Sequence, residues 1–237
     1  GGENVIDVAT PEIPQGVERW SDLDRLNRER DLVGIYLSAH PLDEFSIVLE
    51  HVCNTRMSEL EDKAALAGRE ITMGGIVTSV RRGVSKNGNP YGIAKIEDYS
   101  GSTEIPFWGN DWVTYQGYLN EGTFLYIKAR CQAKQWRQDE LEIKITSMEL
   151  LPDVKEELVQ KITIIIPLSV LNTALVTELA TLTKESPGNT ELYFKVTDDS
   201  DTNHMSVDLI SRPIKLSVGR DLITYLKERP ELGFRIN

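Results

Sequence analysis

From Glu70 onward, apolar positions alternate with polar ones in five separate runs of the chain. A period of two residues indicates β-strands with one buried face. The runs are separated by tight-turn signals, among them Asn87-Gly88 and Ser100-Gly101. The pattern predicts strands at residues 70–84, 90–99, 102–108, 123–136 and 140–150.

A short helix is expected between the third and fourth strands, where Trp112, Tyr115 and Leu119 recur at helical spacing. Its apolar side is suited to close one end of a barrel. Five strands with a helix in this position are the arrangement of the OB-fold, a small Greek-key barrel that presents its second and third strands to a ligand. We therefore predict an OB-fold domain at residues 69–151.

In the residues before the predicted barrel, apolar side chains recur at helical spacing. Ser21, followed three residues later by Asp24, indicates a helix N-terminus, and Pro41 breaks the helix that begins there. The apolar positions of the two helical stretches are Leu23, Leu26, Val33 and Leu37, then Leu42, Phe45, Leu49 and Val52. The sequence predicts a helical hairpin with an acidic outer surface at residues 20–68, preceded by a linker at residues 1–19.

A second mixture of strands and helices begins after Pro152. Residues 162–166 indicate a buried strand, and leucines at helical spacing between residues 171 and 182 indicate a helix. Alternating segments follow near residues 192–196, 205–209 and 216–218, then a helix near residue 222 and a strand at 234–236. Residues 152–237 are therefore predicted to form a small domain. The whole chain is expected to be α+β and mainly β: a helical segment, a five-stranded OB-fold barrel and an α+β C-terminal domain.

The charge of the whole chain opposes nucleic-acid binding, because the net charge is −11 and phosphates require a positive local field. The charge is unevenly distributed, however. Residues 1–68 carry −8, residues 69–151 are neutral and residues 152–237 carry −3. Within the predicted barrel, most of the basic side chains gather in two stretches. Residues 69–96 hold Arg69, Arg81, Arg82, Lys86 and Lys95, and residues 128–137 hold Lys128, Arg130, Lys134 and Arg137.

The cysteines, Cys53 and Cys131, are far apart and have no cysteine close by in the sequence. This excludes a CxxC zinc site and favours a reducing cytoplasm. No apolar run has the length of a membrane span, so no membrane partner is expected. The first residues, Gly1-Gly2-Glu3-Asn4, have neither a starting Met nor the pattern of a secretory signal, and we expect a fragment of a longer cytoplasmic protein.

Catalytic motifs are missing from the sequence. It contains no P-loop, dinucleotide-binding, nucleophile-elbow or zinc-protease motif. The adjacent acids Glu97 and Asp98 point to opposite faces of a strand, and Asp98 is expected to shape the turn that follows. His40, with Asp43 nearby, lacks the further ligands that a metal site needs and marks a helix break instead. We therefore expect no catalytic residue, metal site or cofactor in this part of the protein.

Alternation also assigns the two faces of the second and third strands. With Ala94, Ile96, Thr103, Ile105 and Phe107 inside, the outward residues are Tyr91, Ile93, Lys95, Glu104 and Trp108. Tyr91 and Trp108 are then each placed to stack a base, worth roughly 1–3 kcal/mol apiece. Cations in the first and last hairpins are placed to hold phosphates. The predicted nucleic-acid-binding residues are Arg81, Arg82, Lys86, Tyr91, Lys95, Trp108, Lys134, Trp136 and Arg137.

A second interpretation of these residues stays open. Trp108 and Trp136 can simply cover the barrel ends while the arginines are solvated. Glu104, on the same face as Trp108, also opposes the binding of phosphates.

Residues 29–45, which include Ser38-Ala39-His40-Pro41-Leu42, resemble the helical segment before the barrel in bacterial replicative DNA polymerase III alpha subunits. The last domain, which closes on Phe234-Arg235-Ile236-Asn237, resembles the C-terminal domain of that family. The landmarks of the barrel occur in the family's order and at similar spacing, and are Gly75-Ile-Val, Val80-Arg-Arg, Lys86-Asn-Gly, Ile96-Glu-Asp and Ser100-Gly. The barrel landmarks alone are shared with anticodon-binding domains of tRNA synthetases.

The resemblance implies a non-catalytic C-terminal part of a DNA-directed DNA polymerase. It implies that the barrel binds single-stranded template DNA, and that the sliding clamp and the tau subunit of the clamp loader are partners. The parent polymerase is expected to use Mg²⁺ in a part of the protein outside this sequence. Two alternatives remain, namely a module that binds only protein, and the anticodon-binding OB domain of a class II tRNA synthetase. Ile93 stands where related anticodon-binding barrels often have a stacking Phe.

Overall fold

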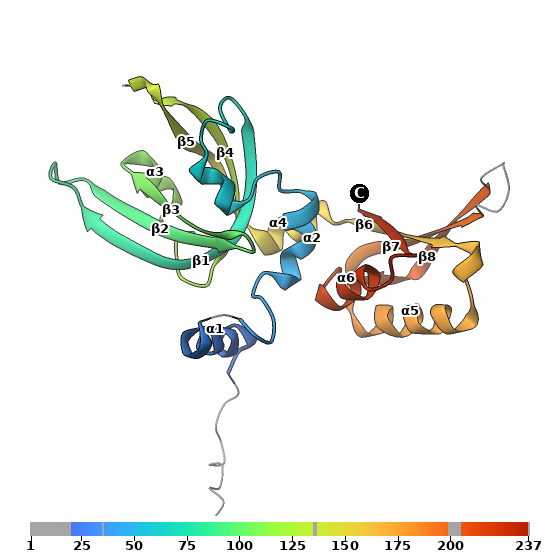
Figure 1. Cartoon of the computed structure of the whole chain (residues 1–237). Coiled ribbons are helices and arrows are strands. Elements are labelled where there is room, and N and C mark those ends of the chain that lie inside the picture. The colour runs from blue at the N-terminus through green and yellow to red at the C-terminus, as the bar shows by residue number, and fades with distance from the viewer. Residues whose placement is uncertain (1–19, 35, 135–136, 199–204, 237) are drawn as a thin grey trace, which may run out of the picture. The chain divides into compact units, whose positions relative to one another are not determined.

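The computed structural model describes residues 20–34, 36–134, 137–198 and 205–236. Contacts within the chain divide it into two units, Gly1–His40 and Pro41–Asn237 (Figure 1). Each unit is described by itself below.

The first unit contains one described helix, α1 (Asp22–Val33). The Ser21 hydroxyl accepts a hydrogen bond from the amide of Asp24 at 3.1 Å, as the capping signal predicts. Gly34 ends the helix in the left-handed region, at φ +90°, a conformation that glycine adopts without steric cost. Because the helix ends there, Leu37 lies beyond the apolar stripe to which its spacing assigns it.

The second unit begins with short helices packed on the barrel. The first two are η1 (Asp43–Phe45) and α2 (Ser46–His51), and η2 (Met57–Glu61) follows. Leu42, Ile47 and Val48 are buried, and the rings of Phe45 and Phe124 lie 4.9 Å apart. The two arms of the predicted helical hairpin therefore fall into different units, since α2 packs against the barrel.

The barrel is one antiparallel sheet of five strands in the order β3-β2-β1-β4-β5. The central strand is long enough to pair with β4 through its first half and with β2 through its second half. The predicted OB-fold class is confirmed. The elements are β1 (Glu70–Val84), β2 (Pro90–Asp98), β3 (Gly101–Trp108), α3 (Asn110–Tyr115), β4 (Phe124–Lys134) and β5 (Arg137–Leu150).

The helix α3 closes the barrel, and its Trp112 lies in the barrel core with Leu119. This is the role that the sequence predicts for these residues. The indole of Trp112 occupies the space above Gly92 of β2, where an added Cβ would come within 2.1 Å of the ring. Glycine at this position therefore makes room for the largest side chain of the plug.

The last domain is a four-stranded sheet of order β8-β7-β6-β9, in which β6 and β7 are parallel and joined through α5. The other pairs are antiparallel. Its elements are β6 (Lys161–Pro167), η3 (Leu168–Val170), α5 (Thr173–Glu185), β7 (Pro187–Asp198), β8 (Met205–Leu216), α6 (Arg220–Lys227) and β9 (Gly233–Ile236).

Two features of this region differ from the sequence pattern. The helix α4 (Leu151–Leu158) precedes β6, where the pattern places only the domain boundary at Pro152. Proline fits the first turn of a helix, so Pro152 lies in the first turn of this helix rather than interrupting it. The alternating segments near residues 205–209 and 216–218 also belong largely to one strand, β8, which ends at Leu216.

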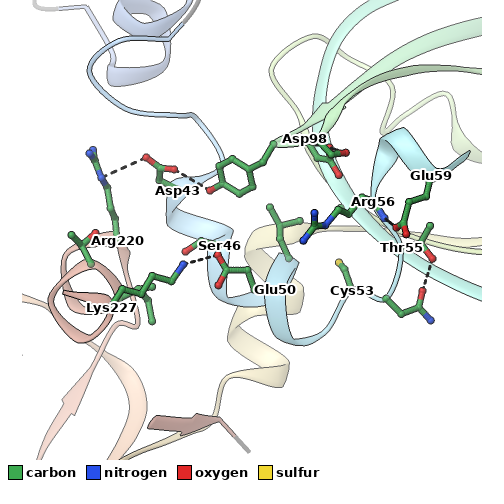
Figure 2. A pocket seen from close by; sticks show the side chains of 17 residues that line it. Asp43, Ser46, Glu50, Cys53, Thr55, Arg56, Glu59, Asp98, Arg220 and Lys227 are labelled. Carbon is green, nitrogen blue, oxygen red and sulfur yellow. Dashed lines mark hydrogen bonds and ion pairs between the residues drawn. The ribbon is translucent and has the colours of Figure 1, made fainter. Parts of the chain in front are cut away.

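A pocket of about 940 Å³ lies between α2, the end of β2 and α6 (Figure 2). Opposite charges bridge it, because Lys227 contacts Glu50 at 2.6 Å and Arg220 contacts Asp43 at 3.5 Å. Burial, with the neighbouring Asp43 carboxylate, raises the pKa of the Tyr99 phenol, which donates a hydrogen bond to Asp43. The wall of the pocket is thus polar and internally paired.

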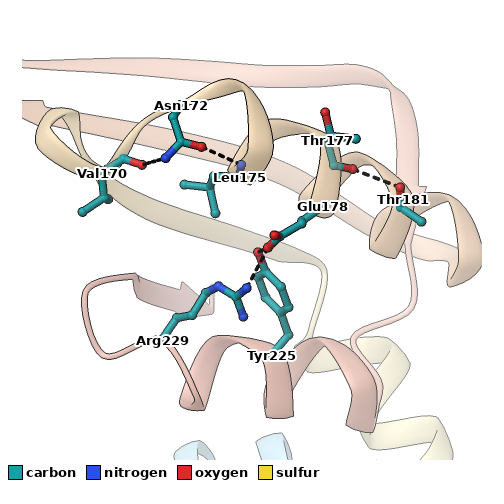
Figure 3. A network of polar contacts seen from close by, with 8 residues as sticks. All are labelled: Val170, Asn172, Leu175, Thr177, Glu178, Thr181, Tyr225 and Arg229. Atoms are coloured by element: carbon teal, nitrogen blue, oxygen red, sulfur yellow. Dashed lines mark hydrogen bonds and ion pairs between the residues drawn. The ribbon is translucent and has the colours of Figure 1, made fainter.

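The helices α5 and α6 of the last domain are joined through one carboxylate (Figure 3). Glu178 of α5 accepts hydrogen bonds from the Tyr225 hydroxyl at 2.9 Å and from Arg229 at 2.7 Å. Partial burial and the bond to Glu178 raise the pKa of Tyr225 to about 12. The hydroxyl therefore stays protonated at neutral pH and remains a donor.

Gly92→Ala is expected to destabilise the fold, because the new methyl group must displace the Trp112 ring from the barrel core. Overpacking of this kind costs about 1–3 kcal/mol of unfolding free energy. Chemical denaturation measures it. The matched control is Gly117→Ala, where an added Cβ meets no atom within 4 Å, and its effect is expected to stay below about 1 kcal/mol. Equal losses of unfolding free energy in both variants would contradict the close packing of Trp112 against Gly92.

The thiol of Cys53, in the wall of the pocket, is expected to react slowly. Burial, and to a lesser extent the charge of Asp98, raises its pKa to about 12. The thiolate is the reactive form, so its reaction with a thiol reagent should be at least about 100-fold slower at pH 8 than that of a free cysteine.

The pH profile gives the sharper test of Cys53. With a raised pKa, the thiolate fraction keeps rising tenfold per pH unit through pH 10, whereas an ordinary thiol levels off near pH 9. Cys131 is buried, and its thiol donates to the Lys63 carbonyl at 3.3 Å, so it serves as the slow internal reference. A plateau near pH 9 for Cys53 in the folded protein would show that its environment is not the one described.

Candidate nucleic-acid interface

The outer face of β2 and β3 is built by direct cross-strand pairs. The inward side chains Ala94, Ile96, Ile105 and Phe107 are buried, as the alternation predicts. The outward pairs across the two strands are Tyr91 with Trp108, Ile93 with Pro106 and Lys95 with Glu104. The second half of β1 continues this face with Gly83 beside Tyr91, Arg81 beside Ile93 and Ser79 beside Lys95.

The two aromatic side chains of the face contact each other. The ring centroids of Tyr91 and Trp108 are 4.4 Å apart and their planes are inclined by 30°, which is a stacked arrangement. Trp108 is 53% exposed, whereas Tyr91 is half-buried. The sequence pattern, which places both residues outward, does not show that they form one unit.

Arg81 lies on the same face and is paired with an acid. Its guanidinium contacts the Glu104 carboxylate at 2.6 Å, and both side chains are more than half exposed. An exposed pair of this kind contributes at most about 1 kcal/mol and is screened by salt. Arg81 is therefore available to a phosphate that displaces Glu104.

Arg82 does not share the face with Arg81, because neighbouring strand residues point to opposite sides. Its guanidinium donates to the Leu119 carbonyl at 3.1 Å and to the Asn120 side chain at 3.2 Å. Arg82 thus holds the loop that follows α3. The two adjacent arginines, which look equivalent in the sequence, have different surroundings.

Two lysines, one on the face and one in the adjoining turn, have no acidic partner among the described residues. Lys86 is exposed in the turn between β1 and β2, which Gly88 closes at φ +78°. Lys95 is exposed in the middle of β2, opposite Glu104 in the ladder. Within the part of the chain that the structure describes, their ammonium groups form no ion pair that would compete with a phosphate.

The cations of the last hairpin converge on one carboxylate. Lys134 and Arg137 both contact Glu140, the latter at 2.6 Å. Hydrogen bonds from these two side chains lower the pKa of the Glu140 carboxyl. Trp136 lies outside the described residues, so the structure places Lys134 and Arg137 together but gives no position for the predicted aromatic between them.

Asp98 has the structural role that the turn pattern predicts. Its carboxylate accepts hydrogen bonds from the Ser100 amide at 2.7 Å and from the Met57 amide at 2.9 Å. Within the described part of the chain, no group of three or more His, Cys, Asp or Glu side chains could hold a metal ion. No helix in that part has the length and apolar character needed to cross a membrane.

Family models match both folded regions of the second unit. Residues 71–151 match the OB-fold nucleic acid binding domain, and residues 162–237 match the C-terminal domain of the DNA polymerase III alpha subunit. These bounds correspond to the barrel and to the last sheet with its helices.

Curated relatives agree with this assignment. The DNA polymerase III subunit alpha of Saccharopolyspora erythraea is 26% identical over 185 residues, which cover 76% of this chain and 15% of the relative. The Pasteurella multocida protein of the same name is 27% identical over 176 residues, which cover 74% of this chain and 15% of the relative. The chain thus spans about a seventh of the length of these relatives.

Among solved structures, a mitochondrial single-stranded DNA binding protein from S. cerevisiae aligns with 35% of this chain and 96% of its own, at 17% identity and a TM-score of 0.27. A similarity at this level supports no functional argument. The predicted resemblance is instead confirmed by the family models and the curated relatives: over its barrel and its last domain, the chain is similar to the C-terminal region of DNA polymerase III alpha subunits.

Proposed function

We propose that the outer face of β2 and β3 binds single-stranded DNA, and that the chain is a non-catalytic part of a replicative DNA polymerase. The observation that carries this proposal is the stacked Tyr91–Trp108 pair, which lies on an OB-fold barrel beside the cations of the same face. Aromatic platforms flanked by positive charge are the usual means of binding a single strand without sequence preference.

The charges of the face set the expected strength of binding. Arg81, Lys86 and Lys95 can each neutralise a phosphate, whereas Glu104 repels the strand until Arg81 exchanges it for a phosphate. The chain as a whole carries −11. Binding is therefore weak, tolerant of sequence and strongly dependent on salt.

The activity of the whole protein is part of the same proposal. The curated relatives are named as DNA polymerase III alpha subunits, and the chain covers about a seventh of their length. We assign template guidance to this segment, and place nucleotide transfer with its Mg²⁺ elsewhere in the polymerase. The sliding clamp and the tau subunit of the clamp loader are the proposed partners, in the cytoplasm.

A protein partner has its own candidate surface in the last domain. The edge strand β8 exposes Met205, Val207 and Leu209 by 64%, 58% and 49%, and the alternation of the strand places all three on one face. Apolar patches of this kind mark protein contacts. This surface favours a domain that docks a protein partner beside a barrel that holds DNA. The match of residues 162–237 to the polymerase domain favours the polymerase over a tRNA synthetase.

The combined variant Arg81→Ala/Lys86→Ala/Lys95→Ala is expected to weaken binding of a labelled oligothymidylate at least tenfold in low salt. Losing three phosphate contacts should also reduce the slope of log K against log salt by about 2. Fluorescence anisotropy across a salt series measures both quantities.

The matched control for this experiment is Arg130→Ala. Arg130 forms an exposed ion pair with Glu70 at 2.7 Å, like that of Arg81, on the β1–β4 part of the barrel. Its removal is expected to leave binding within about twofold. The proposed function would be overturned if the parent chain did not bind, or if Arg130→Ala lost as much affinity for the oligothymidylate as the combined variant.

Val207→Lys/Leu209→Lys is expected to weaken the binding of the tau subunit at least tenfold, because it places two charges in the apolar face of β8. Oligothymidylate binding should stay unchanged. The control is Asp208→Lys, on the other face of the same strand. Tau binding that survives the double variant, or is lost equally in the control, would remove this surface as the docking site.

A further inference from the structure

Three residues on neighbouring strands form one row across the outer face of the barrel. Gly83 of β1 is the direct partner of Tyr91 in β2, and Tyr91 is the direct partner of Trp108 in β3. The row consists of a residue without a side chain, a half-buried phenol and an exposed indole. Its order across the sheet gives the two aromatics different surroundings.

The phenol of Tyr91 is enclosed from two directions. An added Cβ on Gly83 would come within 2.8 Å of Cζ and Oη of Tyr91, so the ring lies directly against the glycine backbone. The Trp108 ring stacks on it with a centroid separation of 4.4 Å. A base has no room between these rings, because inserting one requires about twice the stacking distance.

The indole of Trp108, unlike the enclosed phenol, is more than half exposed. It is 53% exposed, and β3 is the edge strand of the five-stranded sheet, so among the described residues no further strand of this sheet lies beyond it. Tyr91 covers one face of the indole, and the 53% exposure of Trp108 shows that much of the rest of the side chain is accessible to solvent. A large rigid π-surface held by a neighbouring ring is what an unpaired base requires for stacking.

Positive charge is present along the same row. Arg81 precedes Gly83 by two residues and points to the same side of β1, and Lys86 lies in the turn just beyond it. A strand whose base stacks on the indole therefore has cations within reach for its flanking phosphates. Every base has a π-face, so stacking on the indole is expected to accept any of the four.

We propose that Trp108 is the base-stacking residue of this face, that Tyr91 is a positioning residue that holds the indole, and that Gly83 provides the space in which Tyr91 lies. The site takes one unpaired nucleobase of a single strand rather than two. This inference rests on the proposed function, since it assigns roles within the same surface.

Anisotropy titrations of the full chain with a labelled oligothymidylate test these roles. Trp108→Ala is expected to weaken binding on the order of 5- to 150-fold, the range of one lost base stack. The slope of log K against log salt should stay unchanged, because no phosphate contact is removed. Trp108→Phe keeps a smaller ring and should restore most of the affinity.

The positioning role of Tyr91 has a separate readout. Tyr91→Phe keeps the ring against Gly83 and is expected to bind within about twofold of the parent, whereas Tyr91→Ala releases the indole and binds more weakly. Gly83→Ala, which displaces the phenol, should weaken binding as Tyr91→Ala does. The salt slope should again stay constant, and thermal unfolding of each variant verifies that it is folded.

The outcomes of these titrations distinguish this inference from the proposed function on which it rests. If the parent chain does not bind, the proposed function fails, and the assignment of Trp108 as the stacking residue fails with it. A different result is that the parent chain binds and removal of the cations weakens binding, while Trp108→Ala binds like the parent. In that case the proposed DNA surface stands, and the assignment of Trp108 as the stacking residue is wrong. A loss in Tyr91→Phe as large as in Tyr91→Ala would make the Tyr91 hydroxyl a direct contact and overturn the positioning role.

Discussion

The register between β1, β2 and β3 is the constraint on which the rest of the barrel depends. Burial of Ala94, Ile96 and Phe107 on the inner side fixes which residues face outward. A slip of one residue would exchange the two faces and place Tyr91 in the core. The plug formed by Trp112 over Gly92 reinforces this register from inside, because only this alignment gives the indole its space. The outer surface is thus determined by the packing of the interior.

Electrostatics alone would give the outer face a modest affinity for a polyanion. Arg81 is neutralised by Glu104, and Arg82 is turned away toward the loop at Leu119. Lys134 and Arg137 share one carboxylate. In the proposed binding mode, the stacked aromatic pair is therefore expected to make the larger specific contribution, and the cations chiefly to set the dependence on salt. This division suits the proposed function, in which a template strand crosses the surface without being held.

Much of the fold can be predicted from the sequence, because alternation and turn signals are local properties. The five strands, the helix at Trp112 and the parts of the last domain follow from such patterns. The helix that begins at Leu151 does not, because Pro152 resembles a break in the pattern although proline fits a first helical turn. The contact of Tyr91 with Trp108 depends on how two strands align, which no single segment of sequence shows. The opposite directions of Arg81 and Arg82 do follow from strand geometry.

The central claim is that single-stranded DNA lies on the outer face of β2 and β3. The most direct measurement is a map of backbone amide chemical-shift changes while the chain is titrated with oligothymidylate in low salt. The account predicts that the largest changes gather at Tyr91, Lys95 and Trp108 and their β1 neighbours, and weaken together as salt is added. Changes centred on α6 or β8, with this face unaffected, would contradict it.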